Sequence, residues 1–263
     1  MHIICLVKFI PDVDNWHYDY ESHVLIRDKS EQIINPDDSA ALAYALSLKQ
    51  ARGASVEVVT MGPQPVVGSV RDLLRCGADR AVILTDKQFA GSDTYATSLV
   101  LATYLQDREF DLILTGTRAL DGDTAHVPAQ IAEILGLEQM SFIKKFDEPN
   151  SSEAKVVFDV ETDREVLTYE MALPAVCSLT RDAPYKLPYI RYDDIGLYVD
   201  DRLEILGSAD INLPNAAFGQ NGSLTKIASA FTKDPSEKEQ IFVKTDDEGV
   251  LRVYEFLVEE GYL

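Results

Sequence analysis

The sequence predicts an α/β protein in which a parallel sheet is covered by crossover helices. Up to about residue 143, short runs rich in β-branched residues alternate with segments of helical periodicity, as in repeated β-α-β units. These runs are almost continuously apolar, which is typical of strands buried on both faces. The length of 263 residues, with 46% hydrophobic residues, suits one large globular domain with appendages. The expected strands are residues 3–7, 56–60, 81–85 and 112–116.

Helices are expected in the intervals between these strands. Asn35 precedes Pro36, a pair typical of a helix start in which Asn caps the free N–H groups and Pro takes the first helical position. Leu42, Ala45 and Leu46 then share one face of that helix. Three further helices are expected at residues 65–76, 93–105 and 124–135.

After residue 145 the pattern changes to an antiparallel hairpin. Residues 156–160 and 166–171 flank a polar turn at Thr162-Asp163, and a returning strand follows at 175–178. We therefore expect an α/β domain over residues 1–183, with the hairpin, at about 155–171, as an insertion on it.

The remainder, residues 184–263, is expected to form a C-terminal arm. From Arg181 to about Val243 the segment is polar, has little periodicity and is broken by prolines. So long a segment rarely lacks structure inside a compact domain, so we expect it to wrap another molecule. A capping box at Thr245–Glu248 then opens an amphipathic helix.

The net charge of −20 argues against nucleic acid and anionic membrane surfaces as partners, because no basic patch offsets it. The three cysteines and four histidines lack metal-ligand spacing, so no metal is assigned. No apolar run approaches the roughly 18 residues of a membrane span, so we expect no membrane insertion and a cytoplasmic location.

The strongest candidate for chemistry is the segment after the strand 112–116. That strand ends at Gly116, a polar loop follows, and a helix is expected to begin near Thr124. Ligands bind at the carboxyl edge of parallel sheets, where a helix N-terminus attracts phosphate. Alternatively, Asp121, Asp123 and Thr124 simply cap the helix, which the spacing by itself favours. Gly-rich phosphate motifs and a nucleophile elbow are missing.

Two other strand ends face the same edge. In Thr60-Met61-Gly62-Pro63 the chain bends at Gly62, so a ligand could approach the backbone beside Met61. The alternative is that this segment is an ordinary turn between a strand and a helix. Thr94 and Thr97 lie one helical turn apart at the start of the helix 93–105. The sequence by itself favours the alternative that Ser92 or Asp93 is a plain N-cap there.

The run Ala-Leu-Asp-Gly-Asp-Thr-Ala-His-Val at residues 119–127 resembles the nucleotide-binding loop of electron-transfer flavoprotein β (small) subunits, where A-I-D-G-D-T-A-Q-V is usual. Further motifs of that family follow in the same order along nearly the whole chain. They are residues 7–8 with 11–12, 35–38, 60–63, 77–81, 165–166, 173–176 and 222–226. Each motif is weak, but their order and spacing make the resemblance strong.

The resemblance implies a domain like that of the adenine nucleotide α-hydrolases, with a nucleotide at the carboxyl edge of its sheet. Thr94 and Thr97 would lie near the reactive end of the ligand or near NADH. The implied cofactor-binding residues are Leu6, Asn35, Pro36, Asp37, Asp38, Met61, Thr94, Thr97, Gly116, Ala119, Asp121, Gly122, Asp123, Thr124, Ala125, His126 and Val127. Because flavin chemistry belongs to the cofactor, no catalytic acid, base or nucleophile is assigned.

The resemblance also implies a partner, an electron-transfer flavoprotein α subunit that carries FAD and is embraced by the arm 184–263. The heterodimer would pass electrons between NADH or acyl-CoA dehydrogenase-type partners and a downstream acceptor. The second nucleotide, in this chain, is FAD or AMP. Gly122 resembles the FAD-binding, electron-bifurcating members, since AMP-binding relatives tend to have a further acidic residue there, and a glycine lets the backbone adopt positive φ near a diphosphate.

Two departures from the family pattern concern the ligand and the partner. His126-Val127-Pro128-Ala129 replaces the common Gln-Val-Gly-Pro, and residues 184–205 are acidic where many relatives are lysine-rich. A second hypothesis is a stand-alone adenine-nucleotide-binding regulator of the stress-protein type. That class expects a compact dimer and has no use for the arm.

Overall fold

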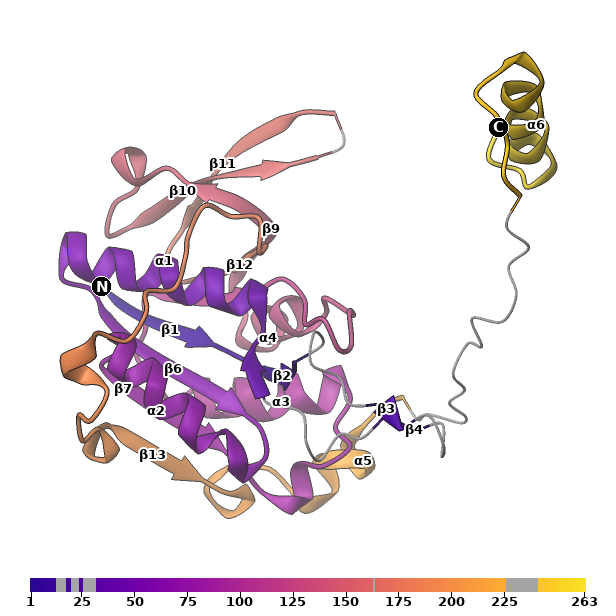
Figure 1. Ribbon diagram of the computed structural model, residues 1–263. Helices are drawn as coiled ribbons and strands as arrows, with labels where there is room; N and C mark the ends of the chain where they lie inside the picture. Colours follow the sequence, from indigo (N-terminus) through magenta and orange to yellow (C-terminus); the bar gives the residue numbers. More distant parts are fainter. Residues whose placement is uncertain (13–17, 20–23, 26–31, 163, 226–240) are drawn as a thin grey trace. The chain divides into compact units, whose positions relative to one another are not determined.

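The computed structural model describes residues 1–12, 18–19, 24–25, 32–162, 164–225 and 241–263, and it confirms the α/β class (Figure 1). The chain divides into two compact units, Met1–Lys226 and Ile227–Leu263. Asp163 of the predicted turn and residue 226 of the motif 222–226 lie outside the described part, as do residues 226–240 of the predicted arm.

The first unit is built on a nine-stranded sheet. Seven neighbouring strands of this sheet run parallel to one another. The other two form the expected antiparallel hairpin at one edge. The order is β11 (Val166–Ala172), β10 (Lys155–Glu161), β9 (Glu138–Phe146), β12 (Ala175–Leu179), β8 (Leu112–Gly116), β1 (His2–Leu6), β6 (Ser55–Met61), β7 (Arg80–Leu84) and β13 (Leu203–Leu206). Two small sheets pair β2 (Phe9–Pro11) with β5 (Gln32–Ile34) and β3 (Tyr18–Asp19) with β4 (Val24–Leu25).

Helices cover both faces of this sheet. On one face α1 (Pro36–Arg52) and α2 (Val67–Cys76) pack against the side chains of Ile3 and Cys5. On the other face α3 (Thr94–Leu105) and α4 (Val127–Leu135) belong to the cluster of Ile4 and Leu6. Successive residues of a strand point to opposite faces, so the buried part of β1 must be apolar at every position, as Ile3–Leu6 is.

Most helix boundaries agree with the prediction. α1 begins at Pro36, and Asp93 caps α3 by accepting a hydrogen bond from the Ala96 N–H (2.9 Å). α2 begins at Val67, two residues later than expected, because Gln64–Val66 forms a separate 3₁₀ turn. The expected start of the helix at Thr124 is wrong by three residues, as described below.

In the nine-stranded sheet, β9 and β13 were not expected, and neither were the short strands of the two small sheets. β9 is mostly half-exposed and bulged, so it lacks a continuous apolar run. β13 has only four residues, too few to show a period, and it lies in the segment expected to wrap a partner. It extends the sheet beside β7 and is held by ion pairs of Arg71 with Asp200 (2.6 Å) and of Arg80 with Glu204. The expected boundary at 183/184 therefore falls inside the first compact unit.

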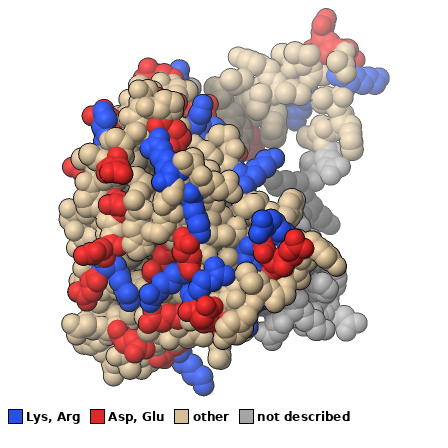
Figure 2. Space-filling view, turned by 90° about the vertical axis from the view of Figure 1, so that its left-hand side faces the viewer, with Lys and Arg blue, Asp and Glu red and all other residues tan. Residues whose placement is uncertain are grey.

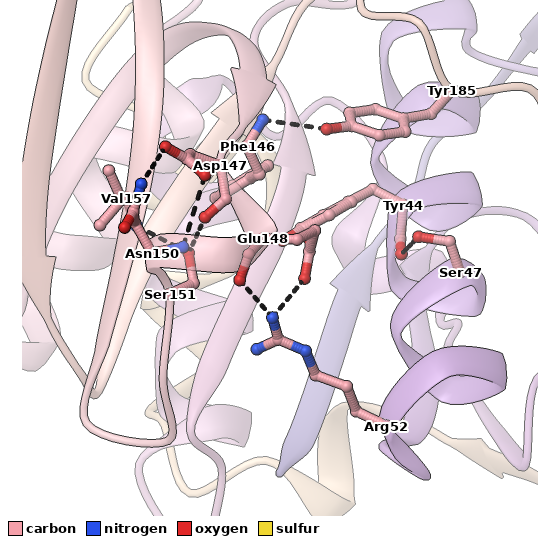
Figure 3. Close-up of polar contacts among 10 residues, drawn as sticks. All are labelled: Tyr44, Ser47, Arg52, Phe146, Asp147, Glu148, Asn150, Ser151, Val157 and Tyr185. Atoms are coloured by element: carbon pink, nitrogen blue, oxygen red, sulfur yellow. Dashed lines mark hydrogen bonds and ion pairs between the residues drawn. The ribbon is translucent and has the colours of Figure 1, made fainter.

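The hairpin is fixed to α1 through an aromatic cluster (Figure 3). The ring of Tyr44 stacks on that of Phe146, with centroids 4.1 Å apart, and the Phe146 N–H donates to the Tyr185 hydroxyl (2.9 Å). Below this stack Arg52 pairs with Glu148 at 3.0 Å. The hairpin is thus an antiparallel extension of the main sheet, packed on the same core.

The second unit, of which residues 241–263 are described, contains α6 (Asp247–Glu259). The predicted helix is confirmed, but its N-cap is Asp246, which accepts from the Gly249 N–H (2.9 Å), and the expected capping box at Thr245 is wrong by one residue. A short helix, α5 (Gly219–Gly222), belongs to the first unit. None of the helices in the described part of the chain has the length and apolar character needed to cross a membrane.

Acidic and basic side chains are interspersed on the face of the molecule shown in Figure 2. Lys and Arg do not gather there into a surface free of carboxylates, as the scattered basic residues of the sequence predict. The negative net charge therefore has no opposing basic field on this face.

Candidate functional site

The chain reverses its direction of travel across the sheet between β1 and β8. From β1 it crosses by α1 to β6, whereas it returns from β7 to β8 by α3 on the opposite face. Such a topological switch point leaves a crevice at the carboxyl ends of the two strands, and ligands of open α/β sheets bind there. The strands end here at Leu6 and Gly116.

Asp38 links the ends of these two strands. Its Oδ2 accepts a hydrogen bond from the Lys8 N–H (2.8 Å), and its Oδ1 accepts one from the Gly116 N–H (2.7 Å). A Cβ on Gly116 would lie 2.4 Å from Asp38 Oδ1, so only glycine allows α1 to approach this closely. Asp37 makes a similar link, accepting from the N–H groups of Arg181 (3.0 Å) and Arg118 (3.3 Å).

Both carboxyl groups are buried, and burial sets their acidity. Burial raises the pKa of Asp38 to about 7, although the N–H groups of Lys8 and Gly116 favour the anion. Burial also raises the pKa of Asp37, against the hydrogen bonds from Arg181 and Arg118. Because both side chains are engaged by the protein's own backbone, they shape the edge of the sheet and do not face a ligand as free groups.

Asn35 holds the loop that follows β8. It occupies the N-cap position of α1, but its side chain makes no capping hydrogen bond, so its expected role as a side-chain cap is wrong. Its Nδ2 donates instead to the Arg118 carbonyl (2.8 Å), and its Oδ1 accepts from the Leu120 N–H (3.3 Å). Asn35 therefore fixes the loop 117–126 to the start of α1.

Two ion pairs neutralise the acidic side chains of this loop. Lys8 Nζ lies 2.7 Å from both carboxylate oxygens of Asp121. Arg118 pairs with Asp123 at 3.1 Å. The carboxylates therefore add little net negative charge at the point where a phosphate would have to approach.

The capping interpretation of Asp121, Asp123 and Thr124 is wrong, because α4 begins only at Val127. Asp123 and Ala125 have left-handed φ values of 48° and 55°, which a helix does not allow. Among the described residues, no hydrogen-bond acceptor reaches the backbone N–H groups of Thr124, Ala125, His126 and Val127. Three consecutive free donors therefore precede α4, and the N–H of Val127, its first residue, is a fourth.

Gly122 lies in the same loop, and its φ is not positive, so that expectation is wrong. The left-handed positions are its neighbour Asp123 and Ala125 instead. Gly122 is exposed, and a Cβ there would meet no atom within 4 Å. The loop conformation thus does not require glycine at this position.

The remaining predicted residues lie at the same edge. Met61 packs in the cluster that contains Leu6, and Pro36 is half-buried at the start of α1. Thr94 and Thr97 are half-buried in the first turns of α3. The N-terminal turns of α3 and α4 are neighbours, since Ser98 Oγ donates to Gln130 Oε1 (2.9 Å). Among the described residues, no hydrogen bond or ion pair joins Thr94 or Thr97 directly to the loop 119–127.

Three residues of the site were not among the predicted ones. Lys8 and Arg118 could have been found, because each basic residue comes one or two positions after the end of a buried strand. Phe142 in β9 could not, since its position depends on a bulge that the sequence does not signal. Its N–H donates to Thr117 Oγ1 (3.3 Å), at the first position of the loop.

Comparison with known proteins identifies the family of the chain. Residues 22–187 match the model of the electron transfer flavoprotein domain. The chain is 34% identical over 264 residues, the full length of both proteins, to the electron transfer flavoprotein subunit beta of Clostridium acetobutylicum. It is 31% identical to the subunit of that name from Megasphaera elsdenii, over 99% of this chain and 97% of the other. It is also 34% identical, over 88% of each chain, to the caffeyl-CoA reductase-Etf complex subunit CarD of Acetobacterium woodii. The chain therefore belongs to the electron transfer flavoprotein family, as a member of its β-subunit branch.

Proposed function

We propose that this chain is the β subunit of a heterodimeric electron-transfer flavoprotein and that it binds FAD at the carboxyl edge of its sheet. The observation that carries the proposal is the set of four free N–H groups at residues 124–127, beside acidic side chains already neutralised by Lys8 and Arg118. Consecutive free amides ahead of a helix are typical of phosphate binding.

The other residues of the edge suit the rest of a nucleotide. Leu6 and Met61 offer an apolar surface at the ends of β1 and β6, suited to a planar ring system. Lys8 and Arg118 place two cationic side chains beside this loop, and charged donors of this kind are typical partners of phosphate oxygens. A bound flavin supplies the electron-accepting ring, and the chain's residues would bind it, orient it and keep the phosphates in place.

FAD is favoured over AMP by the loop composition. An aspartate in place of Gly122 would put a third carboxylate between Asp121 and Asp123, and the described structure provides ion-pair partners for two. With glycine, the loop holds no unpaired negative charge to repel a diphosphate. AMP has only one phosphate, so carboxylates in the loop would repel it less than they would repel FAD.

A partner subunit is supported by the second unit of the chain. α6 exposes large apolar side chains, among them Val250 (65% exposed) and Tyr254 (57%). Contiguous apolar surface on a helix is typical of protein contacts. We assign this surface to a FAD-carrying α subunit. CarD is named as part of a reductase-Etf complex, which supports NADH- or acyl-CoA dehydrogenase-type electron partners for this chain too.

Nucleotide analysis of the purified heterodimer tests the cofactor. After denaturation, two FAD per heterodimer support the proposal, whereas one FAD with one AMP contradicts it. Gly122→Asp should lower the occupancy of the flavin in this subunit only, because the added charge lies in its loop. Gly122→Ala is the matched control, since a Cβ there meets no atom within 4 Å.

A size measurement tests the partner. On co-expression with the α subunit, the chain should elute as a heterodimer. A self-contained dimer of this chain that binds adenine nucleotide and ignores the α subunit would support the stand-alone regulator instead.

A further inference from the structure

Phe142 has a backbone conformation that is uncommon for a bulky residue. Its φ of 62° lies in the left-handed region, where the Cβ of an L-residue crowds the backbone. Such strain persists only where the surrounding structure imposes it, and it is concentrated at functional sites.

A β-bulge imposes this conformation. Met140 pairs with Cys177 and Ile143 pairs with Leu179, so Ser141 and Phe142 together lie opposite Ser178. Bulges of this kind redirect a side chain and occur next to binding sites. The bulge is tied to the binding loop, because the Phe142 N–H donates to Thr117 Oγ1 (3.3 Å) and the Thr117 N–H donates to the Leu179 carbonyl (2.9 Å).

The strained residue also exposes its ring. The Phe142 side chain is 49% exposed, whereas Ile143 and Phe146 of the same strand are buried. Left-handed backbone and an exposed aromatic ring both disfavour the folded state relative to a glycine or asparagine at this position. The chain nevertheless places the backbone of Phe142 beside Thr117, the first residue of the loop, and leaves its side chain exposed, which points to a ligand contact.

The order of the strands indicates which part of a ligand reaches it. Leu6 and Met61 end β1 and β6, the free N–H groups follow β8, and Phe142 lies in β9, two strands farther from β1. Neighbouring strands are about 4.8 Å apart, so β9 is roughly 14 Å from β1. If one ring system occupies the apolar end and the phosphates occupy the loop, a second ring system extends towards β9. FAD has that second ring system and AMP does not.

Resting on the proposed function, we propose that the ring of Phe142 packs against the isoalloxazine of the bound FAD, which makes Phe142 a residue that discriminates FAD from AMP. Asparagine and glycine tolerate left-handed φ, so Phe142→Asn and Phe142→Gly remove the ring without adding strain. Phe142→Tyr keeps the ring. Tyr189→Asn is the control, because Tyr189 is 96% exposed and lies outside the site.

The test uses the full-length chain in complex with its α subunit and titrates FAD and AMP into the emptied site of this chain. In Phe142→Asn we expect FAD to bind on the order of 10-fold more weakly, which is typical of losing one aromatic stacking partner. AMP affinity should change less than about 2-fold, and Phe142→Tyr should restore FAD affinity. The urea midpoint of the Asn and Gly variants should not fall below that of the wild type, because the strain is relieved.

Four results would overturn the inference. Unchanged FAD affinity in the Asn and Gly variants would show that Phe142 does not contact the ligand. An equal loss of affinity for FAD and AMP would show that Phe142 only maintains the conformation of the loop. A lower urea midpoint in both variants makes it a packing residue. A wild-type complex that binds AMP but no second FAD refutes the proposed cofactor and this inference together, whereas the first three outcomes leave the proposed function intact.

Discussion

Adding one methyl group at Gly116 should strongly lower the stability of the folded chain. A Cβ there would lie 2.4 Å from Asp38 Oδ1 and 2.6 Å from the backbone nitrogen of Asp38. The nitrogen belongs to the first turn of α1 and cannot rotate away. Gly116→Ala must therefore push the start of α1 away from β8.

Two terms determine the size of the effect. Overpacking a well-packed interior by one methyl group costs about 1–3 kcal/mol. The shift also lengthens the hydrogen bond from the Gly116 N–H to the buried carboxylate of Asp38, a charged hydrogen bond of about 1.5–3 kcal/mol. Together we expect Gly116→Ala to lower the free energy of unfolding by roughly 3–5 kcal/mol, a large part of a typical total of 5–15 kcal/mol.

Urea denaturation of the full-length chain, followed by far-ultraviolet circular dichroism, measures this loss. The matched control is Gly122→Ala in the same loop, where the new Cβ meets no atom within 4 Å; its effect should stay within about 0.5 kcal/mol. The reasoning would be refuted by a Gly116→Ala variant as stable as the control.

Three further predictions concern titration, the arm and the helix α3. The pKa of Asp38 is about 7 in the folded chain and about 3.9 in an unfolded one. The folded state therefore binds one more proton between these values, so its stability should fall as pH rises from about 4 to about 7; urea midpoints across this range should show a flatter profile for Asp38→Asn. Deleting residues 227–263 should leave the first unit folded but abolish pairing with the α subunit on size exclusion, and a truncated chain that still pairs at full affinity would refute the assignment of the second unit. Replacing Thr94 and Thr97 with Val keeps their volume but removes two hydroxyl groups, each worth on the order of 1 kcal/mol when bonded. Nucleotide affinity and reduction by NADH should weaken, and unchanged kinetics would remove both residues from the site.

Much of the sheet could be predicted because burial on both faces leaves a local signal. The strands β1, β6, β7 and β8 are apolar at nearly every position, and the helices between them carry Pro36, Asp93 or an apolar stripe at their starts. β9 and β13 escaped detection because one is half-exposed and bulged and the other has four residues. Their place is decided by neighbours far away in the sequence.

The site shows the same division. The sequence alone determined that a polar loop leaves Gly116 at the carboxyl edge of a parallel sheet, and the order of its motifs determined the family, because strand direction and loop composition are local properties. Only the tertiary structure decided how the residues of that loop are used. From the sequence, Asp121 and Asp123 could cap a helix or pair with cations. In the folded chain they pair with cations, because Lys8, 113 residues from Asp121, and Arg118 lie beside them. Likewise, the strain at Phe142 arises from a bulge, in which two residues of β9 lie opposite one residue of β12. These features depend on long-range pairing, and no local sequence pattern encodes which partners the fold brings together.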